Sequence, residues 1–214
     1  PMKRVNLGKK FRHYVDTETT GLDDEQDELL EVAIVTEEVH PEDPYRAMPP
    51  TFWAQKIKPV NPVPPEAARI NGYTPELWAD SVPFTVDLAR TIGDKLKGGI
   101  LIGHSISFDI GFLTSAFRRV GAKPKFSHRN IDTIALAYDR WGIEGDIDQL
   151  SLDYLRTFLG IPPCTPHNAL TDAMDCRTVF HEIHRPNVRG TLNRWRNHLI
   201  SKVRDELSYL GFCD

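Results

Sequence analysis

The stretch YVDTETTGLD, residues 14–23, places two carboxylates, Asp16 and Glu18, directly after an apolar approach. In a β-strand, residues i and i+2 point to the same face and lie roughly 6.5–7 Å apart. Two carboxylates that close resist ionising together unless a cation lies between them. Taken alone, the pattern is also typical of a strand that ends in a turn, so other segments must decide between chemistry and a turn.

A third acidic residue of interest, Asp109, follows the short apolar run GILIGH, residues 99–104. Asp109 is predicted to lie in the first turn of the next helix, where the helix dipole favours a negative charge. The simpler interpretation is a helix-start aspartate with Ser107 as the capping residue.

The third segment is PHNALTDA, residues 166–173. On one helix His167 and Asp172 would lie about 140° apart and would not share a face. They can converge if His167 belongs to the preceding loop and Asp172 to the first turn, a boundary that Pro166 and the capping residue Asn168 support. A loop histidine near several carboxylates is a candidate general base, although a surface histidine is the alternative.

The order of the elements predicts an α/β layer fold with a mixed sheet. A first strand ends at 14–16, and a meander with short connections implies that the sheet begins antiparallel. Residues 40–50 form a proline-rich loop. Further strands are predicted at 29–38, 51–59 and 99–104, and helices at 64–71, 81–98, 108–121, 132–141, 151–159, 169–184 and 191–209.

The composition is that of a globular protein, with 214 residues and 40% hydrophobic content. No apolar run approaches the roughly 20 residues of a membrane span, and no secretory signal is evident. Three cysteines without framework spacing predict a reducing, cytoplasmic location. A zinc cluster is disfavoured because the spacing matches no finger or ribbon pattern. Its members would be Cys164, His167, Cys176, His181 and His184.

The charges are segregated although the net charge is only −4. Residues 16–31 hold eight acidic side chains and no base, whereas 118–129 and 185–204 hold bases and no acid. This distribution suits metal chemistry on a phosphate chain, and solvated helix faces are the alternative.

Together and in this order, DTETTG, HSISFD and HNALTDA resemble the three motifs of the DEDDh branch of the DnaQ-like 3′–5′ exonucleases. The resemblance covers about residues 11–185 and includes INGYTPE, IDTIALA and LSLDYLRTFLGI as connecting segments. The chain departs from the family pattern at Ser105, where members often carry asparagine, and the loop at 40–52 is longer than usual.

The resemblance implies an RNase H-like fold with a five-stranded mixed sheet flanked by helices. It also implies an exonuclease domain over residues 11–185, which leaves 186–214 as a basic, helical C-terminal extension. Phe108 is expected to pack in the core.

By the same resemblance, Asp16 bridges two Mg²⁺ or Mn²⁺ ions. Glu18 and Asp172 complete the first metal site, and Asp109 supports the second through water. His167 removes the proton of the attacking water. Hard oxygen ligands suit these ions better than zinc.

The family's contacts with the 3′-terminal nucleotide match Thr17, Thr19 and Leu22. The expected activity is removal of nucleoside 5′-monophosphates from single-stranded or frayed DNA 3′ ends, with DNA favoured over RNA and a DNA polymerase or replisome as a partner. Trimming of RNA as in RNase T or oligoribonuclease, a binding module of a replisome, and a small-molecule phosphodiesterase remain as alternatives.

Overall fold

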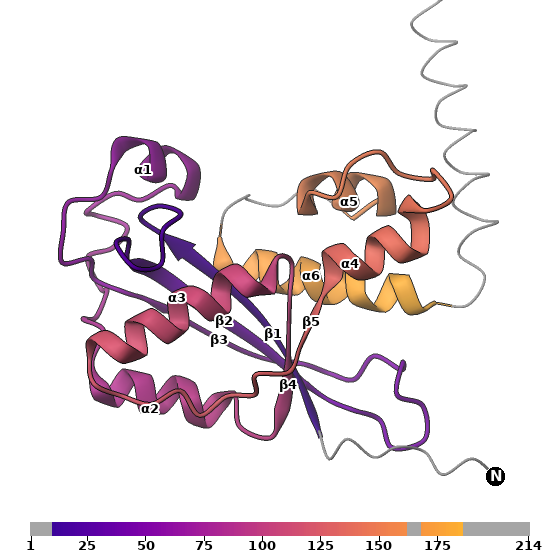
Figure 1. The fold of residues 1–214 in the computed structure, drawn as a ribbon, viewed down its shortest axis with the longest axis horizontal. Coiled ribbons are helices and arrows are strands. Elements are labelled where there is room, and N and C mark those ends of the chain that lie inside the picture. Colours follow the sequence, from indigo (N-terminus) through magenta and orange to yellow (C-terminus); the bar gives the residue numbers. More distant parts are fainter. Residues whose placement is uncertain (1–9, 162–167, 186–214) are drawn as a thin grey trace, which may run out of the picture.

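The computed structural model describes residues 10–161 and 168–185, which form one mixed sheet flanked by helices (Figure 1). The sheet order is β3-β2-β1-β4-β5. Strand β1 pairs antiparallel with β2 and parallel with β4, as the predicted antiparallel start and mixed sheet require. The strands are β1 Phe11–Thr19, β2 Leu29–Glu38, β3 Thr51–Lys56, β4 Gly99–Gly103 and β5 Asn130–Asp132.

The helices agree with the predicted segments in order and differ at some ends. They are α1 Pro65–Asn71, α2 Val86–Lys95, α3 Ile106–Arg119, α4 Thr133–Ala137 followed by the π-helical turn η1 Tyr138–Gly142, α5 Leu152–Leu159 and α6 Ala169–His184. Helix α2 begins later than predicted because Thr85 caps it, its hydroxyl accepting the N–H of Leu88. The helix predicted at 191–209 and the extension 186–214 lie outside the described residues.

The two faces of the sheet are covered by different helices, because successive side chains of a strand point to opposite sides. Val15 of β1 packs in a core built with α2 and α3. Its neighbour Tyr14 packs in a core built with α6. Figure 1 shows α2 and α3 on one side of the sheet and α6, with α4 and α5, on the other. Phe108 packs against Phe112 beside the first core, as expected.

Strand β1 extends beyond its pairing with β4. The described pairs run from Phe11 with Gly99 to Tyr14 with Ile102, whereas pairing with β2 continues to Thr19. The carboxyl half of β1 is therefore paired on one side only. The alternation that directs Tyr14 toward α6 also directs Asp16 and Glu18 to that face.

A saturated charge cluster lies at the other end of the same strand. The buried carboxylate of Glu37 accepts hydrogen bonds from Arg12 at 3.1 Å, from the hydroxyl of Tyr14 at 2.8 Å and from Arg177 at 2.8 Å. His181 lies 2.9 Å away. Burial opposes ionisation of Glu37, but its hydrogen bonds from His181 and Tyr14 outweigh that effect and lower its pKa to about 2.

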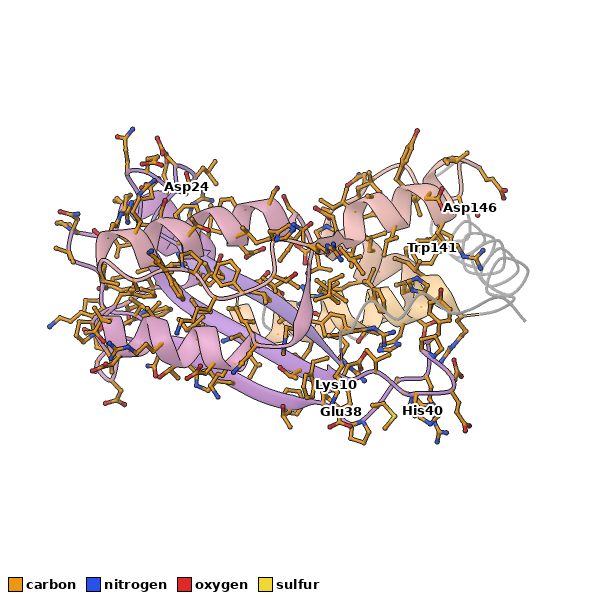
Figure 2. All side chains as sticks on the ribbon, turned by 60° about the horizontal axis from the view of Figure 1, so that its bottom comes forward. Lys10, Asp24, Glu38, His40, Trp141 and Asp146 are labelled. Atoms are coloured by element: carbon orange, nitrogen blue, oxygen red, sulfur yellow. The ribbon has the colours of Figure 1, made fainter. Side chains whose placement is uncertain are left out.

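This cluster also fixes the long loop after β2. Arg177 donates to the carbonyl of Met48 at 2.9 Å, and Arg12 donates to the carbonyl of Pro44. Figure 2 places His40 of this loop near Lys10 and Glu38, at the opposite end of the molecule from Asp24. The loop therefore lies far from the carboxyl end of β1.

Candidate active site

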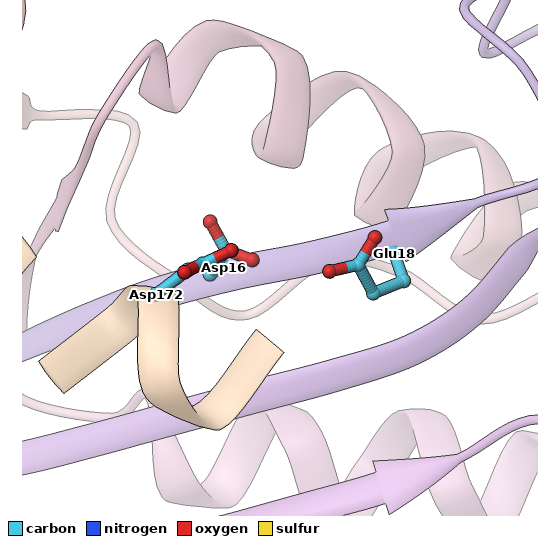
Figure 3. Close-up of side chains that lie close together, drawn as sticks. All are labelled: Asp16, Glu18 and Asp172. Atoms are coloured by element: carbon cyan, nitrogen blue, oxygen red, sulfur yellow. The ribbon is translucent and has the colours of Figure 1, made fainter. Parts of the chain in front are cut away.

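Three of the predicted carboxylates meet at the carboxyl end of β1 (Figure 3). Asp16 and Glu18 come from β1, and Asp172 comes from the first turn of α6. One oxygen of each lies within 4.8 Å of the others. The motifs are far apart in the sequence, and the packing of α6 on β1 brings them together.

Helix α6 is fixed at its first turn by its own cap and by contacts from two other elements. The side chain of Asn168 caps the helix and accepts the N–H of Thr171 at 3.2 Å, as predicted. The N–H of Ala169 donates to Glu31 of β2. Arg156 of α5 donates to Asp172 at 3.0 Å. The start of the helix is therefore fixed to β2 and α5, and Arg156 holds the Asp172 carboxylate itself.

The cluster is strongly anionic and partly removed from water. Burial, followed by the charges of Asp109, Asp172 and Glu18, raises the pKa of Asp16 well above its ordinary value. Burial and the charges of Asp172 and Glu31 raise the pKa of Glu18 to about 8. Carboxylates in this arrangement favour either protons or a cation.

Asp109 stands outside this group of three. It lies buried in the first turn of α3, as predicted, and accepts the hydroxyl of Thr17 at 2.8 Å. Burial raises its pKa to about 7 although the hydrogen bonds from Thr17 act in the opposite direction. A contact of Asp109 with a metal through water stays a prediction.

The predicted cap of α3 is wrong. Ser107 lies inside the first turn, and the N-cap position belongs to Ser105, whose side chain makes no capping hydrogen bond. Ser105 has φ 67°, the left-handed conformation, and its N–H donates to Asp132 at 3.2 Å. Asparagine tolerates this conformation better than serine, which gives a backbone reason for the family's preference at this position.

The residues matched to nucleotide contact differ in their exposure. The side chain of Thr17 is buried and its hydroxyl donates to Asp109, so a nucleotide would be contacted at this position by the backbone of Thr17. Thr19 donates its hydroxyl to Gly21 at 2.6 Å, and its carbonyl accepts the side chain of Asn71 at 3.1 Å. Leu22 is 87% exposed on the loop after β1.

His167 lies outside the described residues, as does Cys164. Cys176 is buried, and burial raises the pKa of its thiol. His181 is bonded to Glu37. Within residues 10–161 and 168–185, the group of side chains able to hold a metal is Asp16, Glu18 and Asp172. Two members of the disfavoured zinc cluster, Cys164 and His167, lie outside those residues.

Part of the basic segment 118–129 contacts part of the acidic segment 16–31. Arg118 pairs with Glu25 at 2.6 Å, and Arg119 donates to the carbonyls of Asp24 and Asp27. The last acid of the loop, Glu28, accepts the N–H groups of residues 60 and 61. Two bases of the run 118–129 therefore hold the acidic loop after β1.

Two polar residues at the site were not predicted. Glu31 is a lone charge within the apolar strand LLEVAIV and pairs opposite Glu18 across the β1–β2 ladder. Arg156 lies on the apolar face of α5, four positions after Leu152. A charge on the buried face of an amphipathic element is the pattern that could have identified both.

A five-stranded mixed sheet of RNase H-like type with acidic side chains at the end of its central strand defines a class of metal-dependent nucleases. Comparison with known proteins agrees, because residues 14–180 match the Exonuclease (RNase T) family. The chain belongs to this family and is a DnaQ-like exonuclease, a hydrolase. No helix in the described part of the chain has the length and apolarity to cross a membrane.

Relatives and solved structures extend this result. The chain is 28% identical over 195 residues to DNA polymerase III subunit epsilon of Treponema pallidum, covering 90% of this chain and 86% of that protein. It is 32% identical over 129 residues to the Pasteurella multocida subunit, covering 58% of this chain and 49% of that one. E. coli Exonuclease I in complex with a dT13 oligonucleotide shares the fold, with a TM-score of 0.69 at 19% identity, over 85% of this chain and 42% of that chain.

Divalent cations fit the residues present. Asp16, Glu18 and Asp172 offer hard oxygen donors, which Mg²⁺ and Mn²⁺ prefer. The raised pKa values of Asp16 and Glu18 also favour cation binding, because a cation between the carboxylates would relieve their mutual repulsion.

Proposed function

We propose that this chain removes nucleoside 5′-monophosphates from the 3′ ends of DNA, single-stranded or frayed, with two Mg²⁺ or Mn²⁺ ions. The observation that carries this proposal is the convergence of Asp16, Glu18 and Asp172 at the end of β1 in a chain of the Exonuclease family. Metal ions at such a site stabilise the charge that develops on the attacking and leaving oxygens of the phosphodiester.

The roles proposed for the side chains combine this cluster with the family resemblance. Asp16, whose pKa is raised by the charges of Asp109, Asp172 and Glu18, would be a ligand of both ions. Glu18 and Asp172 would hold the first ion, and Asp109 would support the second through water. His167, which precedes the cap of α6 in the sequence, takes the proton of the attacking water as general base.

The preference for DNA rests on the relatives. The Treponema pallidum and Pasteurella multocida proteins are DNA polymerase III epsilon subunits, and the E. coli Exonuclease I structure contains a dT13 oligonucleotide. These likenesses support proofreading or end trimming beside a DNA polymerase, in the cytoplasm. The exposed Leu22, next to the site in sequence, suits an apolar contact with the terminal nucleotide.

The test uses 5′-labelled DNA and RNA oligomers, single-stranded and duplex, incubated with Mg²⁺, Mn²⁺ or EDTA. We expect a descending ladder from DNA, inhibition by a bulky 3′ block, and no products in EDTA. Asp16→Asn is the matched inactive control and should retain less than about a tenth of the wild-type rate. Faster processing of RNA than of DNA would indicate RNA trimming instead. Immediate release of the 5′-labelled terminal nucleotide would refute 3′–5′ polarity.

Activity of the isolated chain also separates the enzyme from a binding module. Robust turnover by the chain alone would weaken a purely structural role in a polymerase assembly. Cleavage of model phosphodiesters without processing of oligomers would instead indicate a small-molecule phosphodiesterase.

A further inference from the structure

Arg156 connects the candidate metal site to the helix beside it. Its side chain is 8% exposed and comes from α5, whereas Asp172 and Asp175 come from α6. The guanidinium donates to Asp172 at 3.0 Å, to Asp153 at 2.7 Å and to Asp175. Three carboxylates therefore share one buried cation.

Two of these contacts are explained by packing alone. Asp153 precedes Arg156 by one helical turn and is mostly exposed, and the Asp175 pair joins α5 to α6. The pair with Asp172 differs because this carboxylate also belongs to the group of possible metal ligands. Arg156 binds the Oδ1 atom of Asp172, so that oxygen is already engaged by a buried cation.

We infer that Arg156 is a positioning residue that makes Asp172 a one-oxygen ligand and so favours Mg²⁺ or Mn²⁺ over Ca²⁺; this inference rests on the proposed function. Mg²⁺ requires near-ideal octahedral geometry with short bonds, whereas Ca²⁺ accepts bidentate carboxylates and seven or eight ligands. A carboxylate with one oxygen already engaged cannot become bidentate without breaking a buried ion pair.

The fork of the guanidinium suits this role. Arginine presents several donors in a fixed plane, so it holds Asp172 and Asp175 at the same time in set directions, whereas the donors of an ammonium group rotate on a flexible stem. Its charge is already compensated by Asp175 and Asp153, so it repels an incoming cation less than an unpaired arginine would. Orientation of the ligand, not added charge, is the expected contribution.

The test measures metal affinity directly, by titration calorimetry of the full chain with Mg²⁺, Mn²⁺ and Ca²⁺ in the absence of substrate. Removal of a group that orients a metal ligand typically costs about 10–100-fold in affinity. In Arg156→Gln we expect Mg²⁺ affinity to fall about tenfold and Ca²⁺ affinity to fall less than about threefold, so that the preference for Mg²⁺ narrows.

The matched control is Asp175→Asn, which removes a buried partner of Arg156 but keeps its contact with Asp172. We expect this variant to melt at a lower temperature with an unchanged ratio of Mg²⁺ to Ca²⁺ affinity. Equal changes of the ratio in both variants, or an unchanged ratio in Arg156→Gln, would overturn the inference.

Arg156→Lys covers the case in which the glutamine variant does not fold. Lysine keeps a cation between α5 and α6 but does not hold both carboxylates of α6 in a fixed geometry, so the ratio should shift in the same direction by at least about twofold. An unchanged ratio in the folded lysine variant would also overturn the inference. Absence of metal binding by the wild-type chain would refute the metal site itself, and the proposed function with it.

Discussion

Replacing Asp16 by asparagine should stabilise the metal-free protein and abolish its stabilisation by divalent cations. The reason is the repulsion among Asp16, Glu18 and Asp172, which burial makes worse. The substitution keeps the shape of the side chain and removes one charge. A gain in stability on removal of an acidic residue would identify the site as one that needs a cation.

The magnitude follows from Glu18, whose pKa rises from 4.5 to about 8 on folding. A carboxyl group with a raised folded-state pKa contributes full stability below pH 4.5 and loses it as the pH rises toward 8. At pH 7 the loss is on the order of 3 kcal/mol, since each pKa unit corresponds to about 1.4 kcal/mol. The pKa of Asp16 is raised in the same direction, by burial and by the charges of Asp109, Asp172 and Glu18. With Glu18 setting the scale for one buried carboxylate at this site, removal of the Asp16 carboxylate should relieve about 2–3 kcal/mol, or roughly 4–12 °C in melting temperature.

The assay is a thermal scan of both proteins at about pH 5 and about pH 7, with EDTA, Mg²⁺ or Mn²⁺. In EDTA the variant should melt higher at the neutral pH, and the difference should shrink at the acidic one. Metal at about 100 times its dissociation constant should stabilise the wild type by about 2.7 kcal/mol and leave the variant unchanged. Asp87→Asn, at an exposed aspartate of α2, is the control and should behave as wild type.

A lower melting temperature of metal-free Asp16→Asn would refute the reasoning about repulsion. Equal metal shifts in the two proteins would mean that the ions bind elsewhere, and the metal-site assignment would have to be withdrawn.

Four further results are expected. His167→Ala should lower turnover about 10²–10⁴-fold while calorimetry shows metal binding retained, because the variant lacks a general base and keeps every ligand; collapse of metal affinity would make His167 a ligand. Ser105→Asn should raise the free energy of unfolding by about 0.5–1 kcal/mol in urea denaturation, because the backbone there is left-handed, and no gain would contradict this. Glu37→Gln should lower the free energy of unfolding by about 3–5 kcal/mol at neutral pH, since it leaves buried arginines without their charged partner. The difference in stability between variant and wild type should disappear as the pH falls from 4.5 to about 2, where wild-type Glu37 becomes protonated. A difference independent of pH would show that the effect is one of packing and not of charge. Removal of residues 188–214 should weaken substrate binding more than the chemical step and flatten the salt dependence by about one unit for each phosphate that the segment neutralises; an unchanged salt slope in the folded truncation would exclude phosphate binding by this segment.

Sequence reasoning succeeded where the chain carries a local pattern. The β-branched run 29–38 has the bounds of β2, and the capping residue Asn168 marks the start of α6. The resemblance of three motifs grouped Asp16, Glu18 and Asp172, which no local pattern could have joined. Strand β5 was missed because three residues are too few to show a period, and helix was predicted from 132 onward.

The interactions that the sequence did not reveal depend on packing between distant segments. Thr17 and Asp109 are 92 positions apart, and a buried threonine next to a metal-ligand motif carries no mark of its partner. Arg156 binds residues of the following helix, so its role appears only when α5 and α6 are placed side by side. The acidic loop is predicted to be part of an anionic centre, although Arg118 pairs with Glu25 and Arg119 anchors the loop through the carbonyls of Asp24 and Asp27.

At one end of β1, Arg12 and Tyr14 contact the fully hydrogen-bonded carboxylate of Glu37 on the neighbouring β2, and at the other end the carboxylates of Asp16 and Glu18 repel each other. Natural selection acts on the two ends differently. A change at Glu37 lowers the folded population whether or not the chain has a use, whereas a neutral residue at Asp16 raises stability and is opposed only by a need for activity. In a lineage that no longer required the enzyme, drift would therefore replace Asp16 early and keep Glu37. Homologous chains that retain Glu37 but have lost Asp16 are therefore expected to be folded and inactive.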